Sequence, residues 1–167
     1  IRPGGVYGPG DIDYFELFKQ VERGVTIYFG NRERWFSAVY VDDVVDAIVR
    51  CAASEEAAGK GYFICDGKPV TWQQFQSKLI EVSGKKKVRE IDLPAFLVPL
   101  AAVGGELLTT IDKKPRVMNR QKAIMGKQKA WICTHAAAKR DFGYTPAFDL
   151  EAGIRQTFEW YRQEGWL

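Results

Sequence analysis

The start of the chain shows a helical pattern between capping residues. Three apolar side chains recur there at helical spacing: Phe15, Phe18 and Val21. Asp11 and Asp13 precede them, and a carboxylate in that position accepts hydrogen bonds from the free amides of a first turn. Gly24 follows and supplies the left-handed conformation that ends many helices. The pattern predicts a helix over residues 12–23.

Short runs of β-branched and aromatic residues alternate with the helical patterns. Residues 25–29 and 35–41 have this composition, which predicts two short strands, and residues 62–65 and 88–91 predict two more. Because strands alternate with helices, the pattern favours an α/β fold. The strands are too few and too short to form a doubly wound sheet by themselves.

Three later helices carry caps that are readable from the sequence. Thr71 and Gln74 form a capping box ahead of an apolar helical pattern that Gly84 ends. Thr134 is predicted to cap a short helix that closes at Gly143, and Asp149 a final amphipathic helix. Altogether we expect a few short strands with about five or six helices.

Two adjacent carboxylates, Asp42 and Asp43, stand where the strand of residues 35–41 turns into a helical stripe. Adjacent side chains at a helix start point in different directions, and no third ligand is near in sequence, which argues against a metal site or an acid–base pair. We therefore interpret Asp42 as a structural cap whose carboxylate accepts from the first-turn amides.

Composition restricts the class of protein further. The chain has 167 residues, 46% of them apolar and 27% charged, with a net charge of +3, which is typical of a globular domain and argues against a nucleic-acid-binding protein. Its three cysteines form no Cys-x-x-Cys pair, so neither a disulfide framework nor a zinc site is predicted. A reducing, cytoplasmic location fits this cysteine content.

Two stretches in the second half of the chain have unusual compositions. Residues 93–105 are apolar but interrupted by prolines and glycines, and they are shorter than the roughly 20 residues of a membrane span. We interpret them as a buried helix or the wall of an apolar pocket. Residues 112–129 hold seven basic side chains. The chain also lacks an initial Met, and we expect it to continue a longer protein.

Four segments carry motifs in order: residues 1–10 (IRPGGVYGPG), 39–47 (VYVDDVVDA), 62–67 (YFICDG) and 139–146 (KRDFGYTP), the last followed by Gly153 and Trp160. Together they resemble the C-terminal half of the extended short-chain dehydrogenase/reductase family, also called the NAD-dependent epimerase/dehydratase family. The resemblance implies an enzyme whose N-terminal Rossmann half binds NAD or NADP and supplies a catalytic Tyr-x-x-x-Lys pair. It also implies that this chain is the C-terminal part of such a Rossmann-type protein.

Neither signature of that N-terminal half occurs in this sequence. Its glycine cluster at residues 4–10 has the wrong spacing for a dinucleotide fingerprint, and none of its seven tyrosines is followed four residues later by lysine. We therefore expect the N-terminal half to be absent from the chain, and the chain alone to bind no cofactor and to have no oxidoreductase activity.

The resemblance also assigns roles to residues near the start of the chain. Pro3, Gly4 and Gly5 would pass the nicotinamide of the cofactor, where a backbone without side chains permits close approach. Val6 and Tyr7 would line the mouth of the substrate pocket.

Two positions depart from the sugar-nucleotide members of the family, which usually carry an Asn in place of Gly5 and an Arg in place of Phe36. Both of these polar contacts to a diphosphate are missing here, although Arg32 or Arg34 remains able to reach the site. The departure favours members that resemble 3β-hydroxysteroid dehydrogenase or dihydroflavonol reductase, which accept larger and less charged substrates.

Three basic residues later in the chain need an interpretation. In this family the region before Trp131 can close over the substrate, so Arg116 and Arg120 are candidate substrate contacts. His135, the only histidine, has no assigned nucleophile beside it and is interpreted as a surface residue.

The domain layout follows from the resemblance. Residues 1–167 are expected to form the substrate-binding C-terminal portion, with residues 1–10 and 61–66 in the Rossmann core and residues 11–41 and 85–167 in the substrate subdomain. The intact protein is expected to be a homodimer that oxidises, reduces or epimerises a hydroxyl or carbonyl carbon. The alternatives are a nucleotide-sugar epimerase or dehydratase and a non-catalytic member that serves as a binding module.

Overall fold

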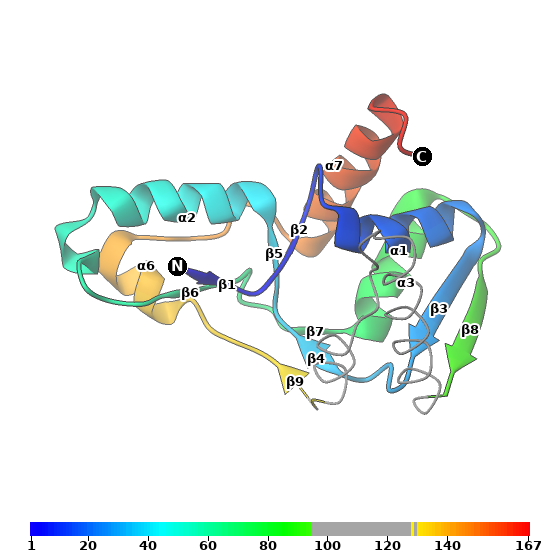
Figure 1. The fold of residues 1–167 in the computed structure, drawn as a ribbon, viewed down its shortest axis with the longest axis horizontal. Coiled ribbons are helices and arrows are strands. Elements are labelled where there is room, and N and C mark those ends of the chain that lie inside the picture. Colours follow the sequence, from blue (N-terminus) through cyan, green and yellow to red (C-terminus); the bar gives the residue numbers. More distant parts are fainter. Residues whose placement is uncertain (95–127, 129) are drawn as a thin grey trace, which may run out of the picture.

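The computed structural model describes residues 1–94, 128 and 130–167 (Figure 1). The strands of this part are β1 (Arg2–Pro3), β2 (Gly5–Tyr7), β3 (Val25–Phe29), β4 (Trp35–Phe36), β5 (Ala38–Tyr40), β6 (Phe63–Ile64), β7 (Val70–Thr71), β8 (Arg89–Leu93) and β9 (Ala130–Trp131). Its helices are α1 (Ile12–Glu22), α2 (Val41–Ala53), the short 3-10 helix η1 (Glu55–Ala57), α3 (Trp72–Ser83), α6 (Ala136–Phe142) and α7 (Leu150–Gln163).

The strands pair in small groups rather than in one sheet. Parallel pairs join β1 to β6, β2 to β5 and β3 to β8, while β4 lies between antiparallel β7 and parallel β9. Parallel strands require crossover connections, and helices supply several of them here. The α/β prediction is confirmed, and the predicted strand at residues 88–91 forms β8, the partner of β3.

Most of the predicted helix caps are confirmed. The Asp11 carboxylate accepts from the backbone N–H groups of Asp13 and Tyr14 at the start of α1. The capping box of Thr71 and Gln74 is complete, with both reciprocal hydrogen bonds present. Asp149 accepts from the N–H of Ala152 and begins α7.

The interpretation of Asp42 as a cap is wrong. Helix α2 begins at Val41, its N-cap residue Tyr40 makes no side-chain capping hydrogen bond, and Asp42 is exposed in the first turn. The buried neighbour Asp43 instead accepts from the backbone N–H groups of Ala147 and Phe148, at 2.8 and 3.3 Å. The Asp42 carboxylate therefore faces solvent, whereas the Asp43 carboxylate binds the loop at residues 147–148.

The start of α6 differs slightly from the prediction. Its N-cap is His135 rather than Thr134, although the Thr134 hydroxyl accepts from the N–H of Ala136 at 3.3 Å. Gly143 ends the helix in the left-handed conformation, as predicted.

The β2–β5 pair separates two apolar clusters (Figure 1). On one side α1, α3 and α7 pack around aromatic rings that include Phe18, Phe75 and Phe158. On the other side α2 and α6 enclose a smaller cluster that includes Ile64 and Tyr144. Since neighbouring residues of a strand face opposite ways, β2 contributes to both clusters.

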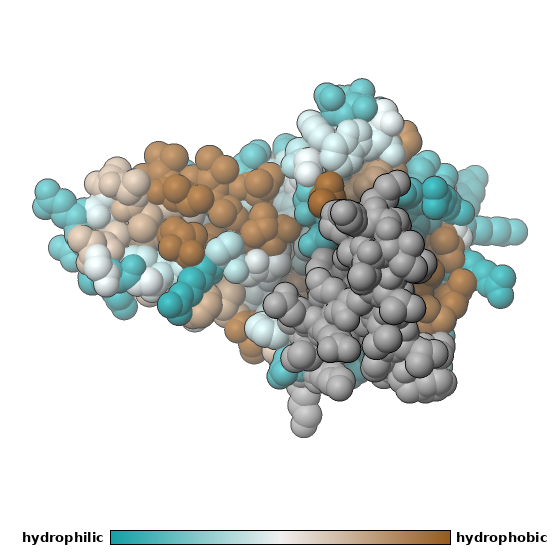
Figure 2. Space-filling model, viewed as in Figure 1, coloured by the Kyte–Doolittle hydropathy of each residue, from teal (hydrophilic) through white to brown (hydrophobic). Residues whose placement is uncertain are grey.

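One face of α2 carries apolar side chains at the surface. Val45, Ile48 and Val49 are 54%, 49% and 63% exposed, and Figure 2 shows apolar residues gathered over this helix. None of the helices in the described ranges is both long enough and apolar enough to cross a membrane.

Candidate functional site

The Pro3–Gly5 segment joins β1 to β2 at the carboxyl end of the β1–β6 pair. Gly4 donates its N–H to the carbonyl of Ile64 at 2.9 Å, and Gly5 donates to the carbonyl of Ser37 at 2.8 Å. A Cβ atom added at Gly4 would overlap the Ser37 carbonyl oxygen. Contact with the neighbouring backbone, therefore, already requires a glycine at position 4.

Gly5 is close to two aromatic side chains. A Cβ atom at this position would overlap the hydroxyl of Tyr14 and would lie 3.5 Å from the ring of Phe36. The Tyr14 phenol thus occupies the space that a side chain at position 5 would need. Burial keeps this phenol neutral by raising its pKa.

Val6 and Tyr7 face opposite sides of the β2–β5 pair. Val6 packs against the smaller apolar cluster around Val39. Tyr7 is only 2% exposed, and its ring contacts Tyr40 and Phe75 with centroids 5.8 and 5.6 Å apart. The structure therefore places Tyr7 in the core, in the same cluster of aromatic rings as Phe36.

Phe36 connects this segment to a second region of the molecule. Its ring stacks on Trp72, with centroids 4.5 Å apart and an interplanar angle of 23°. Phe36 is only 5% exposed. Its ring therefore packs against Trp72 and is not itself available to solvent. Sequence reasoning missed Trp72, whose only signal was its position directly after the cap Thr71.

A cavity of about 140 Å³ lies beside Trp72 and under the turn that follows β3. We call it the loop pocket, and its lining combines apolar and polar side chains: Leu17, Ile27, Tyr28, Phe29, Asn31, Arg32, Arg34, Trp72 and Gln76. The pocket receives residues from α1, β3, the following turn and α3. The predicted residues Gly5, Phe36 and Arg34 lie near one another. Phe36 is close to Gly5 and stacks on Trp72, and Trp72 lines the loop pocket together with Arg34.

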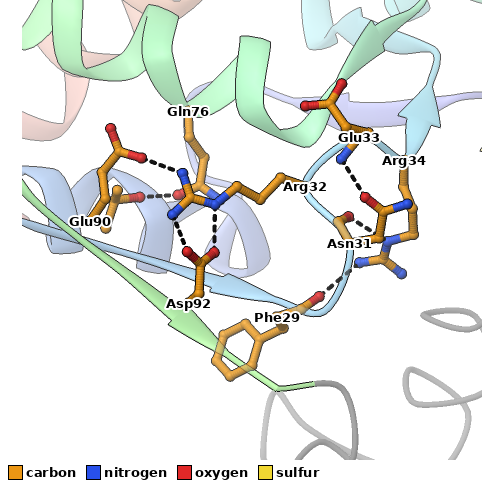
Figure 3. Close-up of polar contacts among 9 residues, drawn as sticks. Phe29, Asn31, Arg32, Glu33, Arg34, Gln76, Glu90 and Asp92 are labelled. Carbon is orange, nitrogen blue, oxygen red and sulfur yellow. Dashed lines mark hydrogen bonds and ion pairs between the residues drawn. The ribbon is translucent and has the colours of Figure 1, made fainter.

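Two arginines of the turn line the pocket in different ways (Figure 3). Arg32 forms a two-pronged ion pair with Asp92 and a further one with Glu90, and these hydrogen bonds raise its pKa. Arg34 donates to the carbonyl oxygens of Asn31 and Phe29 at 3.2 and 3.3 Å, and burial lowers its pKa. Arg34 is thus a partly desolvated cation at the pocket wall.

His135, interpreted from the sequence as a surface residue, is partly exposed and also contacts neighbouring side chains. Its ring packs edge-on against Tyr144, with centroids 5.4 Å apart, and its Nδ1 atom lies 3.7 Å from the Cys65 sulfur. A Cβ atom at Gly67 would come within 2.6 Å of the imidazole. The His135 ring is therefore half-buried, between Tyr144 and the turn at Gly67. Arg116 and Arg120 lie outside the described residues.

The sequence model of the 3-beta hydroxysteroid dehydrogenase/isomerase family matches residues 1–95, more than half of the chain. The chain belongs to this family. The predicted resemblance to extended short-chain dehydrogenases/reductases is thereby confirmed.

Curated relatives of this family member are similar over nearly its whole length. A 2-alkyl-3-oxoalkanoate reductase of Shewanella oneidensis is 28% identical over 93% of the chain, which spans 42% of that protein. Isoform 3 of the 3beta-hydroxysteroid-dehydrogenase/decarboxylase of Arabidopsis thaliana is 29% identical over 98% of the chain and 30% of its own length. The chain thus spans less than half the length of these relatives.

Solved structures support the same fold. UDP-glucose 4-epimerase of Thermotoga maritima is 26% identical, with a TM-score of 0.67 over 98% of this chain and 45% of that one. UDP-glucuronic acid 4-epimerase of Bacillus cereus, solved with NAD, is 17% identical, with a TM-score of 0.70 over 98% of this chain and 44% of that one. The second likeness concerns the fold alone.

Proposed function

We propose that the chain is the substrate-binding part of an NAD(P)-dependent enzyme that oxidises, reduces or epimerises a hydroxyl or carbonyl carbon of a large, weakly charged substrate. The single observation that carries this proposal is that aromatic side chains occupy the space around positions 5 and 36. Tyr14 occupies the side-chain space at Gly5, and Phe36 stacks on Trp72. A phenol and an apolar ring therefore stand where, as the resemblance implies, sugar-nucleotide members of the family hold a diphosphate with an amide and a guanidinium.

The residues assigned to the substrate site in this proposal are Val6, Tyr7, Arg34, Phe36, Arg116 and Arg120. Arg34 has the most direct support, since it lines the loop pocket. Tyr7 and Phe36 act from the core by fixing neighbouring rings, because both are buried. The relative named for a 3beta-hydroxysteroid supports a substrate of that class.

The cofactor in this proposal is NAD or NADP, bound by a longer protein and not by the chain alone. When bound, it accepts or donates the hydride. Pro3, Gly4 and Gly5 would pass its nicotinamide, with Pro3 exposed at the carboxyl end of β1. The space beside Gly4 and Gly5 is filled by Ser37 and Tyr14, so these glycines do not form a cradle for the whole dinucleotide.

An N-terminal Rossmann half is the partner that this proposal requires. The chain matches its relatives over only 30% to 49% of their lengths, which leaves room for that half. The N-terminal half would have an apolar surface to bind. This surface is formed by the exposed apolar side chains of α2 and by Phe63 of β6, which is 48% exposed. A homodimer and a cytoplasmic location remain predictions.

Turnover assays test the proposal. The longer protein is expected to oxidise a 3β-hydroxysteroid with NAD or NADP, while the 167-residue chain alone shows no turnover.

Trp72→Ala in the longer protein should raise KM with little change in kcat, because the loop pocket loses a wall that binds substrate and transition state alike. Trp160→Ala is the matched control, since Trp160 on α7 does not line the pocket. Turnover by the chain alone would contradict the proposal, and an inactive longer protein would favour a binding module.

A further inference from the structure

Two of the three cysteines meet at the carboxyl end of β6. The thiol of Cys65, which directly follows β6, donates to the backbone carbonyl of Cys133 at 3.4 Å, although the two residues are 68 positions apart. The Cys133 side chain also interacts with this thiol. The third cysteine, Cys51, lies on α2 and packs against the smaller apolar cluster. Long-range packing therefore brings Cys65 and Cys133 together as a pair.

The two thiols of the pair differ in their access to solvent. Cys65 is completely buried, whereas Cys133 is half-buried in the segment that follows β9. Burial and, to a smaller extent, the neighbouring Cys133 raise the pKa of Cys65 to about 11, so the Cys65 thiol stays protonated at neutral pH. Oxidants react with accessible thiolates. Cys133 is therefore the cysteine that an oxidant reaches first.

His135 supplies a proton acceptor for Cys65. Its Nδ1 atom lies 3.7 Å from the Cys65 sulfur, and its ring lies between Tyr144 and the turn at Gly67. In the neutral tautomer that is protonated on Nε2, Nδ1 accepts the thiol proton. The cluster thus combines a half-buried thiol, a buried thiol and a base.

We propose that Cys65 and Cys133 form a reversible disulfide when the protein meets hydrogen peroxide. The Cys133 thiolate attacks one peroxide oxygen, which breaks the O–O bond, gives a sulfenic acid and releases hydroxide that the thiol's own proton converts to water. The Cys65 sulfur then attacks the sulfenic sulfur, its proton passes through His135 to the departing hydroxyl group, and a second water leaves. The two thiols lose two electrons and two protons, and one peroxide is reduced to two waters.

The bridge joins two strand groups that are otherwise held together by hydrogen bonds. On one side, Cys65 directly follows Ile64, whose carbonyl accepts the N–H of Gly4 at 2.9 Å. On the other side, the N–H of Cys133 donates to the Ser37 hydroxyl oxygen at 3.0 Å, and its carbonyl accepts from that hydroxyl at 3.3 Å. A covalent link would therefore fix β6 to the segment after β9.

The bridge is a modification and not part of the folded framework. All three cysteines are free in the structure, and thiol reductants reopen a disulfide of this kind. The inference goes beyond the proposed function, because it needs neither cofactor nor substrate.

Peroxide treatment of the 167-residue chain, followed by intact mass spectrometry and peptide mapping, tests the proposal. We expect a mass loss of about 2 Da, a bridge between Cys65 and Cys133, and Cys51 as the thiol that an alkylating reagent still labels. The unfolding temperature should rise by roughly 10 °C, because the bridge closes a long loop in the unfolded chain, and dithiothreitol should reverse both changes.

Cys51→Ser is the matched control, and it should retain the bridge and the rise in unfolding temperature. Cys65→Ser should leave Cys133 as a sulfenic acid that dimedone traps. A bridge that includes Cys51, a disulfide-linked dimer, or a parent chain in which Cys133 reaches the sulfinic acid while Cys65 stays free would overturn the proposal. The mass of the parent chain decides the outcome even where a variant does not fold.

Discussion

Asp43→Ala is expected to lower the free energy of unfolding by about 3 kcal/mol, because a buried carboxylate that accepts two backbone hydrogen bonds is removed. Asp43 is 2% exposed, and its oxygens receive the N–H groups of Ala147 and Phe148 from a loop more than 100 residues away. Burial raises the pKa of Asp43, while the two amides act in the opposite direction.

The loss extends beyond the two hydrogen bonds. The loop held by Asp43 places the Phe148 ring on Tyr40, with centroids 4.5 Å apart, just before α7 begins at Leu150. Without the carboxylate this loop loses its attachment to the start of α2, and the contact between Phe148 and Tyr40 loosens.

Urea denaturation followed by circular dichroism measures this effect. Asp42→Ala is the internal control, since the adjacent Asp42 is exposed and should change stability by at most about 0.5 kcal/mol. Asp43→Asn retains one acceptor and should fall between the two. Equal stability losses for Asp42→Ala and Asp43→Ala would contradict the assignment of a structural role to Asp43 alone.

Gly4→Ala is expected to cost about 3 kcal/mol of folding stability, through overlap of the new methyl group with the Ser37 carbonyl. That carbonyl oxygen cannot move aside easily, because it accepts the N–H of Gly5 at 2.8 Å. The clash therefore pushes β2 away from β5, the pair that separates the two apolar clusters.

Thermal unfolding of Gly4→Ala and Gly61→Ala checks this prediction. A Cβ atom at Gly61 meets no heavy atom within 4 Å, so Gly61→Ala should be close to neutral. If both variants unfold at the same temperature as the parent chain, the contact with the Ser37 carbonyl does not require glycine at position 4.

Local features of the fold were predictable because their causes lie within a few residues. The capping box of Thr71 and Gln74, the cap at Asp149 and the left-handed glycine at position 84 each depend on short-range hydrogen bonds and backbone geometry. The departures at Gly5 and Phe36 were also visible in the sequence, since the motifs around them fix their positions.

Features that depend on long-range packing were not predictable in the same way. The choice between Asp42 and Asp43 depends on the loop at Ala147, and the partial burial of His135 depends on the turn at Gly67. The loop pocket combines α1, β3 and α3, so no single stretch of sequence indicates it. Tyr28 looks like an ordinary strand residue in the sequence, and only the structure shows that its hydroxyl has no hydrogen-bond partner among the described residues.

The central claim is that this family member binds a weakly charged substrate on aromatic rings instead of a sugar nucleotide on polar side chains. A comparison of two substrates by the longer protein that contains this chain tests it most directly, with NAD(P)-linked oxidation of a 3β-hydroxysteroid measured beside formation of the epimerised product from UDP-glucose. We predict that kcat/KM for the steroid exceeds that for UDP-glucose by at least about 100-fold, because a diphosphate would meet Phe36 and Tyr14 without the amide and guanidinium that compensate its desolvation. A preference for UDP-glucose would contradict the account.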